Sequence, residues 1–242
     1  MSLFSIADLH LSGAVDKPMD VFGSRWQDHT NKLSKRWRAV VSPDDTVVVP
    51  GDISWGMTLA EALVDFKFIE SLPGKKIIGK GNHDFWWETM TKMNKFLADN
   101  EIHSISFLFN NAYETEDFIV CGSRGWYVEE KLQNTVGDVD YQKIVLREAA
   151  RLETSIKEAL KIREMSGKPI LVYFHFPPVF GEFICREIVD ILHKYDLNRI
   201  YFGHIHGTYQ IPKTTEFEGI SMTIISADYL NFIPLITAPY DL

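Results

Sequence analysis

The strongest constraint on how this chain folds is a repeated local pattern, in which a short β-branched run ends at glycine and a polar side chain follows. The run Thr46–Val49 leads to Asp52, and the run Lys76–Ile78 leads to the tetrapeptide Gly81-Asn82-His83-Asp84. Polar residues that directly follow buried strands are typical of the carboxyl edge of an α/β sheet, where small ligands bind. The pattern therefore predicts an α/β fold with its functional residues along one edge.

Amphipathic segments separate the apolar runs. Helices are expected over about 24–41, 58–72, 86–97, 139–165 and 182–195, with a loop at 133–138 before the longest of them. Ser24 with Gln27, and Thr58 with Glu61, have the spacing of capping boxes. Strands are expected over 2–7, 46–49, 76–78, 102–109, 117–121, 170–174 and 199–202, with antiparallel strands at 222–225 and 232–236. The alternation implies right-handed crossovers and a partly parallel sheet, with 102–109 and 117–121 as a hairpin across Asn110 and Asn111.

Composition limits the class of protein. A chain of 242 residues with 45% hydrophobic and 24% charged residues is ordinary for a globular protein, and a single domain over residues 1–242 is expected. The net charge of -8 argues against nonspecific binding of nucleic acid. No apolar run is long enough for a membrane span and no basic leader precedes the first strand, so a cytoplasmic protein is expected. Cys121 and Cys185 are too few for a disulfide scaffold and are expected to be buried.

The expected strand ends carry eight polar side chains of metal-binding type: Asp8, His10, Asp52, Asn82, His83, His175, His204 and His206. Five of the eight histidines of the chain are among them. Gly-His-x-His, which occurs here at 203–206, would arise by chance in only about 2% of chains with this composition. The isolated Asp-x-His at 8–10 carries little information alone. The combination predicts a metal site.

The ligand types constrain the metal. Imidazole, carboxylate and amide without thiolate suit Mn, Fe or Zn and not a cysteine-based structural zinc site. Seven candidate ligands, excluding His83, are too many for one ion, but they divide into two sets of four if one carboxylate bridges. Two divalent or trivalent ions roughly 3.5 to 4 Å apart suit phosphate ester hydrolysis, because they activate water and stabilise charge on the phosphoryl oxygens.

At these residues the sequence resembles the calcineurin-like metallophosphoesterase superfamily. The matching motifs are Asp8-Leu9-His10, Gly51-Asp52, Gly81-Asn82-His83-Asp84, His175 and Gly203-His204-Ile205-His206, in the family's order over about 200 residues. The resemblance implies a four-layer α+β fold, in which two mixed β-sheets pack as a sandwich flanked by helices. It implies one metal held by Asp8, His10, Asp52 and His206, and a second held by Asp52, Asn82, His175 and His204.

The resemblance also implies roles outside the ligand set. His83 would donate a hydrogen bond or proton to the substrate phosphate or the leaving oxygen, Asp84 would orient the His83 imidazole, and a metal-bridging hydroxide would attack phosphorus in line. Arg124, between glycines at a strand end, is either a solvated loop charge or a grip on substrate phosphate. The expected substrate is a small-molecule or nucleotide phosphodiester, with a small phosphomonoester as the alternative.

Departures from the superfamily's motifs limit which of its activities this chain is expected to have. Protein Ser/Thr phosphatases carry Asp-Arg-Gly after the Gly-Asp block and Glu after Asn-His. This chain has Gly51-Asp52-Ile53-Ser54-Trp55-Gly56 and Asp84-Phe85-Trp86-Trp87 there, which argues against a phosphoprotein phosphatase. A bacterial branch of predicted phosphohydrolases is similar at two stretches, Gly122-Ser123-Arg124-Gly125-Trp126 and Asn82-His83-Asp84-Phe85-Trp86-Trp87. A non-catalytic scaffold on the same fold is disfavoured because His83 and every ligand position are retained, and the metallo-β-lactamase pattern fails after His206. The diester is favoured over the monoester because the sequence shows no second basic cluster.

Overall fold

The computed structural model, which describes residues 1–126 and 141–237, contains two mixed β-sheets. The first sheet has the order β13 (Leu235–Ile236), β1 (Leu3–Ser5), β2 (Thr46–Val49), β3 (Lys75–Ile78), β4 (Ile105–Phe107). The second has the order β11 (Thr214–Phe217), β12 (Ile220–Ile224), β10 (Arg199–Phe202), β7 (Ile170–Phe174), β6 (Ile119–Ser123), β5 (Tyr113–Glu114). A separate two-stranded ribbon is formed by β8 (Val179–Phe180) and β9 (Phe183–Ile184).

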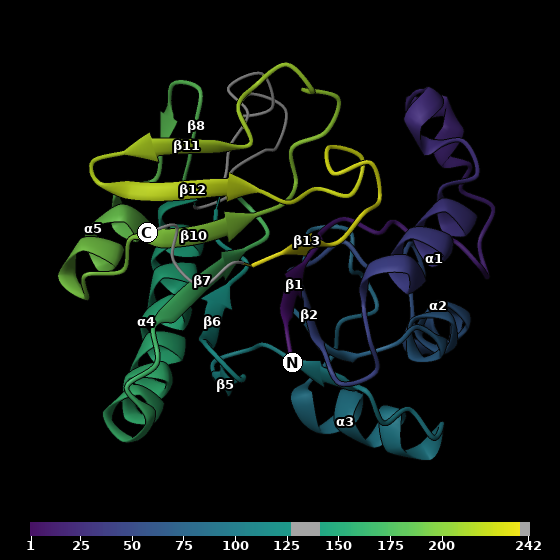
Figure 1. The fold of residues 1–242 in the computed structure, drawn as a ribbon, viewed down its shortest axis with the longest axis horizontal. Helices are drawn as coiled ribbons and strands as arrows, with labels where there is room; N and C mark the ends of the chain where they lie inside the picture. Colours follow the sequence, from purple (N-terminus) through teal and green to yellow (C-terminus); the bar gives the residue numbers. More distant parts are fainter. Residues whose placement is uncertain (127–140, 238–242) are drawn as a thin grey trace.

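Helices cover the outer face of each sheet. Figure 1 shows α1 (His29–Val40), α2 (Leu59–Ser71) and α3 (Met90–Asp99) on one side of the strands, and α4 (Tyr141–Ser166) and α5 (Arg186–Lys194) on the other. Two short 3₁₀ helices, η1 (Met19–Phe22) and η2 (Ser24–Trp26), precede α1. The predicted four-layer arrangement, two mixed sheets flanked by helices, is therefore confirmed.

The central strands are apolar throughout because both of their faces are covered. In β2 and β3, Val48 and Ile77 belong to the hydrophobic cluster between the two sheets, whereas Val47, Val49 and Ile78 belong to the cluster under α1, α2 and α3. Successive side chains of a strand point to opposite faces, so a strand buried on both faces needs an uninterrupted apolar run. Strands β1 to β4 pair in parallel, as the alternation of strand and helix predicted.

One of the two predicted capping boxes forms, and it sets the start of its helix. Thr58 caps α2, since its Oγ1 accepts a hydrogen bond of 3.3 Å from the Glu61 N–H, and the Glu61 carboxylate accepts one of 2.7 Å from the Met57 N–H. The predicted capping box at Ser24 is wrong, because residues 24–26 form η2 and α1 starts only at His29, after Asp28 in a left-handed conformation with φ 52°. The helix expected over 182–195 likewise starts late, at Arg186, because β9 occupies the preceding residues.

The predicted hairpin of 102–109 with 117–121 is also wrong. Strand β4 pairs with β3 in the first sheet, whereas β6 pairs with β5 and β7 in the second sheet, so the chain crosses between sheets at Asn110 and Asn111. Asn110 has φ 58°, and Asn111 uses its side chain to bond Phe109 N and Phe107 O, which stabilises this crossing.

The C-terminal strands follow the prediction only partly. Strand β12 pairs antiparallel with β11 but parallel with β10, and β13 joins the other sheet beside β1. Helix α4 lies where a long helix was expected, and the first two residues of that expected helix, with the loop 133–138, lie outside the described residues. Within residues 1–126 and 141–237, no helix combines the length and apolarity that a membrane crossing requires.

Candidate metal centre

The two sheets meet directly at the site. Ala7, just past β1, forms an isolated parallel bridge with Ser226, just past β12, and its N–H donates to Ile225 O at 2.8 Å. This bridge ties the carboxyl ends of the parallel strands of both sheets together. The loops that follow these strands carry Asp8, Asp52 and the residues around His204 into one cluster.

Several of these loop residues have an unusual backbone conformation. Asp8, His10, Asp52 and His204 have φ values of 61°, 46°, 51° and 68°. Left-handed conformations in residues other than glycine cost of order 1 kcal/mol or more each, and they cluster at functional sites. The chain thus holds four candidate ligands in strained conformations, which indicates a function for them beyond packing.

Two glycines create the space that the buried carboxylates occupy. A Cβ at Gly81 would lie 2.0 Å from Asp52 Oδ1, and a Cβ at Gly203 would lie 2.7 Å from Asp8 Oδ2. Neither contact is sterically possible without a shift of the chain. The glycines of the Gly-Asn-His and Gly-His-x-His motifs therefore allow the ligand loops to approach one another.

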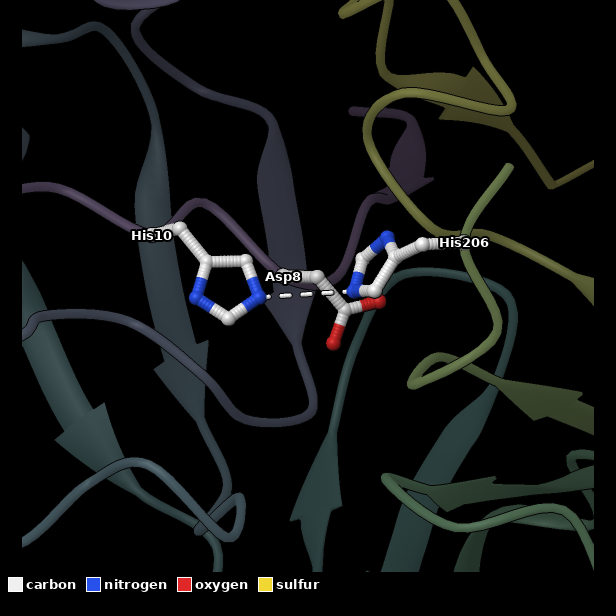
Figure 2. A group of neighbouring side chains, drawn as sticks. All are labelled: Asp8, His10 and His206. Carbon is white, nitrogen blue, oxygen red and sulfur yellow. Dashed lines mark hydrogen bonds between the residues drawn. The ribbon is translucent and has the colours of Figure 1, made fainter. Parts of the chain in front are cut away.

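One group of ligand atoms comprises Asp8, His10 and His206, whose donor atoms lie within 4.8 Å of one another (Figure 2). The Nε2 atoms of His10 and His206 face each other at 3.3 Å. His10 Nε2 also lies 3.6 Å from Asp52 Oδ2. These are the four residues that the resemblance assigned to the first metal.

A second group comprises Asp8, Asp52 and His175. Its neighbours include Asn82, whose Oδ1 lies 2.6 Å from His175 Nε2, and His204, whose ring centroid lies 5.2 Å from that of His175. Asp52 Oδ2 is 3.6 Å from His175 Nε2 as well as from His10 Nε2, so this oxygen lies between the two groups. All seven predicted ligands are thus brought together, with Asp8 common to both three-residue groups.

The chemistry of the cluster fits metal ions. Asp8 Oδ1 and His175 Nδ1 are buried, lie 3.4 Å apart and have no hydrogen-bond partner among the described residues. Burial, together with the charges of Asp84 and Asp8, raises the pKa of Asp52 well above its usual range. Buried carboxylates without partners are costly when ionised, and a bound cation removes that cost.

Burial favours the neutral, metal-ligating form of three histidines of the cluster. Burial lowers the pKa of His10 and of His175 well below the usual value, and neighbouring imidazoles add to the effect. Burial also lowers the pKa of His204 to about 3. Neutral imidazole is the metal-binding form, so these side chains are prepared for a cation without first losing a proton.

Asp228 orients one ligand and was missed by the sequence reasoning. This fully buried carboxylate accepts a 2.8 Å hydrogen bond from His206 Nδ1, and two of 3.0 Å from Gly207 N and Tyr209 OH. Because Nδ1 donates to Asp228, the lone pair of His206 lies on Nε2, which faces His10. Burial alone would lower the pKa of His206, but the bond to Asp228 and the charges of Asp8 and Asp228 raise it.

The role predicted for Asp84 is wrong. Its Oδ1 accepts from Ile53 N, Ser54 N and Trp86 Nε1, and its Oδ2 accepts from Asp52 N and Gly81 N, at 2.7 to 3.4 Å. All of these donors belong to the loops that carry Asp52 and Asn82, so Asp84 organises the ligand loops. It does not hold His83, whose buried Nδ1 has no partner in the described part of the chain.

A family model described as calcineurin-like phosphoesterase matches residues 1–208 of this chain, which include all seven candidate ligands. The chain belongs to the calcineurin-like phosphoesterase family. The "Gene 66 protein" of Mycobacterium phage L5 is 41% identical over 58 residues, 24% of this phosphoesterase chain. The match covers 28% of the length of the phage protein.

Two solved structures share the phosphoesterase fold. Phosphopantetheinyl hydrolase (PptH) from Mycobacterium tuberculosis aligns with a TM-score of 0.54 and 15% identity, over 99% of this chain and 96% of that one. The protein TT1561 of Thermus thermophilus aligns with a TM-score of 0.56 and 11% identity, over 94% of this chain and 89% of that one. At these identities the likeness establishes the fold.

An open pocket of about 690 Å³ borders the ligand cluster of the phosphoesterase. His10, His83 and His206 line it together with Trp55, Phe85 and Lys17; we call it the aromatic pocket. The Trp55 ring lies 4.3 Å from the His83 ring and 5.1 Å from the His10 ring, centroid to centroid. His83 therefore faces both the cluster and a surface suited to an organic group.

Arg124 lines a separate, smaller pocket. The guanidinium Nη2 of Arg124 is 3.4 Å from Glu148 Oε1. Arg124 is therefore not the solvated loop charge that was one of its two expected roles. Lys80, Arg147 and Arg151 line the same small pocket. The sequence argument that no second basic cluster exists is therefore wrong, because these cations are distant in sequence and only the fold gathers them.

Proposed function

We propose that this chain is a metal-dependent phosphoesterase with a dinuclear centre that hydrolyses a small organic phosphate ester. Asp8, His10, Asp52 and His206 would hold one ion, and Asp52, Asn82, His175 and His204 the other. The observation that carries the proposal is the position of Asp52 Oδ2, 3.6 Å from a histidine nitrogen of each group. The donor set of nitrogen and oxygen suits Mn, Fe or Zn.

Bound there, the two cations would activate water at neutral pH and stabilise the charge that develops on the phosphoryl oxygens. The protein would supply positioning. His83 is fixed through its backbone, since its N–H donates to Asp52 Oδ1 at 2.8 Å, and its ring rests against Trp55. We assign to the His83 imidazole the hydrogen bond or proton that the substrate phosphate or the leaving oxygen requires.

The two pockets bear on whether the substrate is a phosphodiester or a phosphomonoester. A phosphodiester has two substituents on phosphorus, and two pockets are present: the aromatic pocket, which His83 lines, and the small pocket that is lined by Arg124 and by Lys80, which stands two residues before Asn82. We therefore keep the phosphodiester as the first candidate. A phosphomonoester is the second, because the cations near Arg124 favour the extra charge of a dianion.

The test is hydrolysis of bis-p-nitrophenyl phosphate and p-nitrophenyl phosphate by Mn²⁺-loaded protein. We expect turnover of at least one ester, abolished in Asp52→Ala, and a loss of about 10²- to 10⁴-fold in kcat in His83→Ala. His103→Ala is the matched control, because this exposed histidine precedes β4 at the opposite edge of the sheet. Turnover that Asp52→Ala fails to reduce would refute the proposal, and an unchanged kcat in His83→Ala would refute the role of His83.

A further inference from the structure

A pocket of about 170 Å³ lies where the ends of β3 and β6 meet α4. Four cationic side chains line it, together with one carboxylate and Ser123: Lys80, Arg124, Arg147, Arg151 and Glu148. We call it the basic pocket. The chain has a net charge of -8, so such a gathering of cations is not a consequence of composition.

One carboxylate faces these four cations. Glu148 is 1% exposed, and its Oε1 accepts from Arg151 Nη1 at 2.6 Å and lies 3.4 Å from Arg124 Nη2. Arg124 Nε is buried and has no hydrogen-bond partner among residues 1–126 and 141–237. Within the part of the chain that the structure describes, Lys80 and Arg147 form no ion pair with any residue. The basic pocket therefore has an excess of positive charge and unused donors.

The basic pocket is connected to the ligand cluster through the backbone. Lys80 stands two residues before Asn82, so their Cα atoms are at most about 7.6 Å apart. The Arg124 carbonyl accepts a 2.8 Å hydrogen bond from Phe176 N, the residue after His175. Two residues that line the basic pocket are therefore backbone neighbours of segments that carry the candidate ligands Asn82 and His175.

We propose that the basic pocket binds a second phosphate group of the substrate, which places the substrate among organic diphosphates and bisphosphates. The inference rests on the proposed function, because it takes the first phosphate to lie at the candidate metal centre. Arginine presents a planar fork of N–H donors that matches phosphate oxygens, and Arg147 and Arg151 are one helical turn apart on α4.

The size of the basic pocket agrees with one phosphate group. At about 30 Å³ per water, its 170 Å³ corresponds to the space of roughly five or six waters. That is room for a phosphate group. A nucleic acid strand would need a continuous basic groove, which the net charge of the chain disfavours.

The experiment measures binding by calorimetric titration of the Mn²⁺-loaded full chain, with Mn²⁺ in excess over the probe. Three probes are compared: inorganic phosphate, methylenediphosphonate and 1,3-propylenediphosphonate. We expect one diphosphonate to bind at least tenfold more tightly than phosphate, since it adds charge-assisted hydrogen bonds. Methylenediphosphonate as the tighter probe would indicate adjacent phosphates, and propylenediphosphonate would indicate separated ones.

Arg147→Gln is the decisive variant, because Arg147 is exposed and its loss leaves the Glu148 pairs intact. We expect it to weaken diphosphonate binding about tenfold and to change phosphate binding less than twofold, and Lys80→Gln should act in the same sense. Arg163→Gln, an exposed arginine further along α4, is the matched control and should change neither.

The outcomes separate the two proposals. If neither diphosphonate binds more tightly than phosphate, or if Arg147→Gln and Lys80→Gln weaken all three probes equally, the second phosphate site is refuted. Asp52→Ala tests the metal centre independently, since it should abolish phosphate binding and hydrolysis. An Asp52→Ala protein that binds phosphate and hydrolyses esters like wild type would refute the proposed function instead.

Discussion

The hydrogen bond from His206 to Asp228 gives a prediction that separates ligand orientation from folding. In Asp228→Asn the side chain keeps its shape but exchanges one acceptor oxygen for an NH₂ donor. Gly207 N–H and Tyr209 O–H both point at Oδ2, and His206 Nδ1 points at Oδ1. The amide satisfies most groups if its oxygen faces Gly207 and Tyr209 and its NH₂ faces His206.

That arrangement reverses the tautomer of the His206 imidazole. His206 Nδ1 would then accept a hydrogen bond, and the proton would move to Nε2, the atom that faces His10 and has to carry the lone pair for a metal. Changes to such supporting carboxylates typically cost 10- to 100-fold in metal affinity, which corresponds to about 1.4 to 2.8 kcal/mol. We expect this loss in Asp228→Asn with little change in the thermal unfolding midpoint of the metal-free protein, because its buried groups remain paired.

The assay is competition for Zn²⁺ or Mn²⁺ with a chromophoric chelator. Tyr209→Phe is the control, since it removes one donor to Asp228 and leaves the bond to His206 in place. It should bind metal within about twofold of wild type. Wild-type metal affinity in Asp228→Asn would refute the argument that this carboxylate fixes the tautomer of His206.

Three further predictions concern the scaffold. Gly81→Ala places a Cβ 2.0 Å from Asp52 Oδ1, so we expect a loss of about 1–3 kcal/mol in urea unfolding. Gly167→Ala, where nothing lies within 4 Å but φ is 70°, reports the cost of backbone strain without a steric clash. Burial lowers the pKa of Lys76 to about 8, so the unfolded state binds more protons between pH 8 and 10.5. The stability of wild type relative to Lys76→Met should therefore rise by about 3 kcal/mol across that interval in denaturant titrations, and a flat difference would contradict it. Cys121 is fully buried and burial raises the pKa of Cys185 to about 11, so a thiol reagent at pH 8 should label neither until the protein is unfolded.

The candidate ligands could be predicted from sequence because a local rule places them. A polar residue directly after a buried parallel strand lies at the sheet edge whatever the rest of the chain does, and this applies to Asp8, Asp52 and His175. Asp228 obeys the same rule, since it follows β12 by four residues, but a single carboxylate in a loop carries no motif. That Asp228 pairs with His206 could only be known from the fold.

Features that depend on contacts between distant segments were not predictable. Arg147 and Arg151 lie in a helix whose exposed face is rich in charge, and such a face is usually solvated. Only the packing of α4 on β6 brings them beside Lys80 and Arg124. The hairpin prediction failed for the same reason, since local turn signals at Asn110 and Asn111 do not state which sheet the next strand joins.

Asp84 and Asp228 explain how strained ligand loops persist. Asp84 accepts hydrogen bonds from the backbone of two ligand loops, at Asp52, Ile53 and Ser54 in one and at Gly81 in the other. Asp228 joins Gly207 and Tyr209 to His206. Hydrogen bonds to a charged acceptor contribute roughly 1.5–3 kcal/mol each, enough to offset the cost of the left-handed conformations at Asp52 and His204. Carboxylates outside the ligand set thus fix the loops before any cation binds. Among the described residues, Asp8 Oδ1 and His175 Nδ1 have no hydrogen-bond partner, and a cation is a partner that suits the chemistry of both atoms.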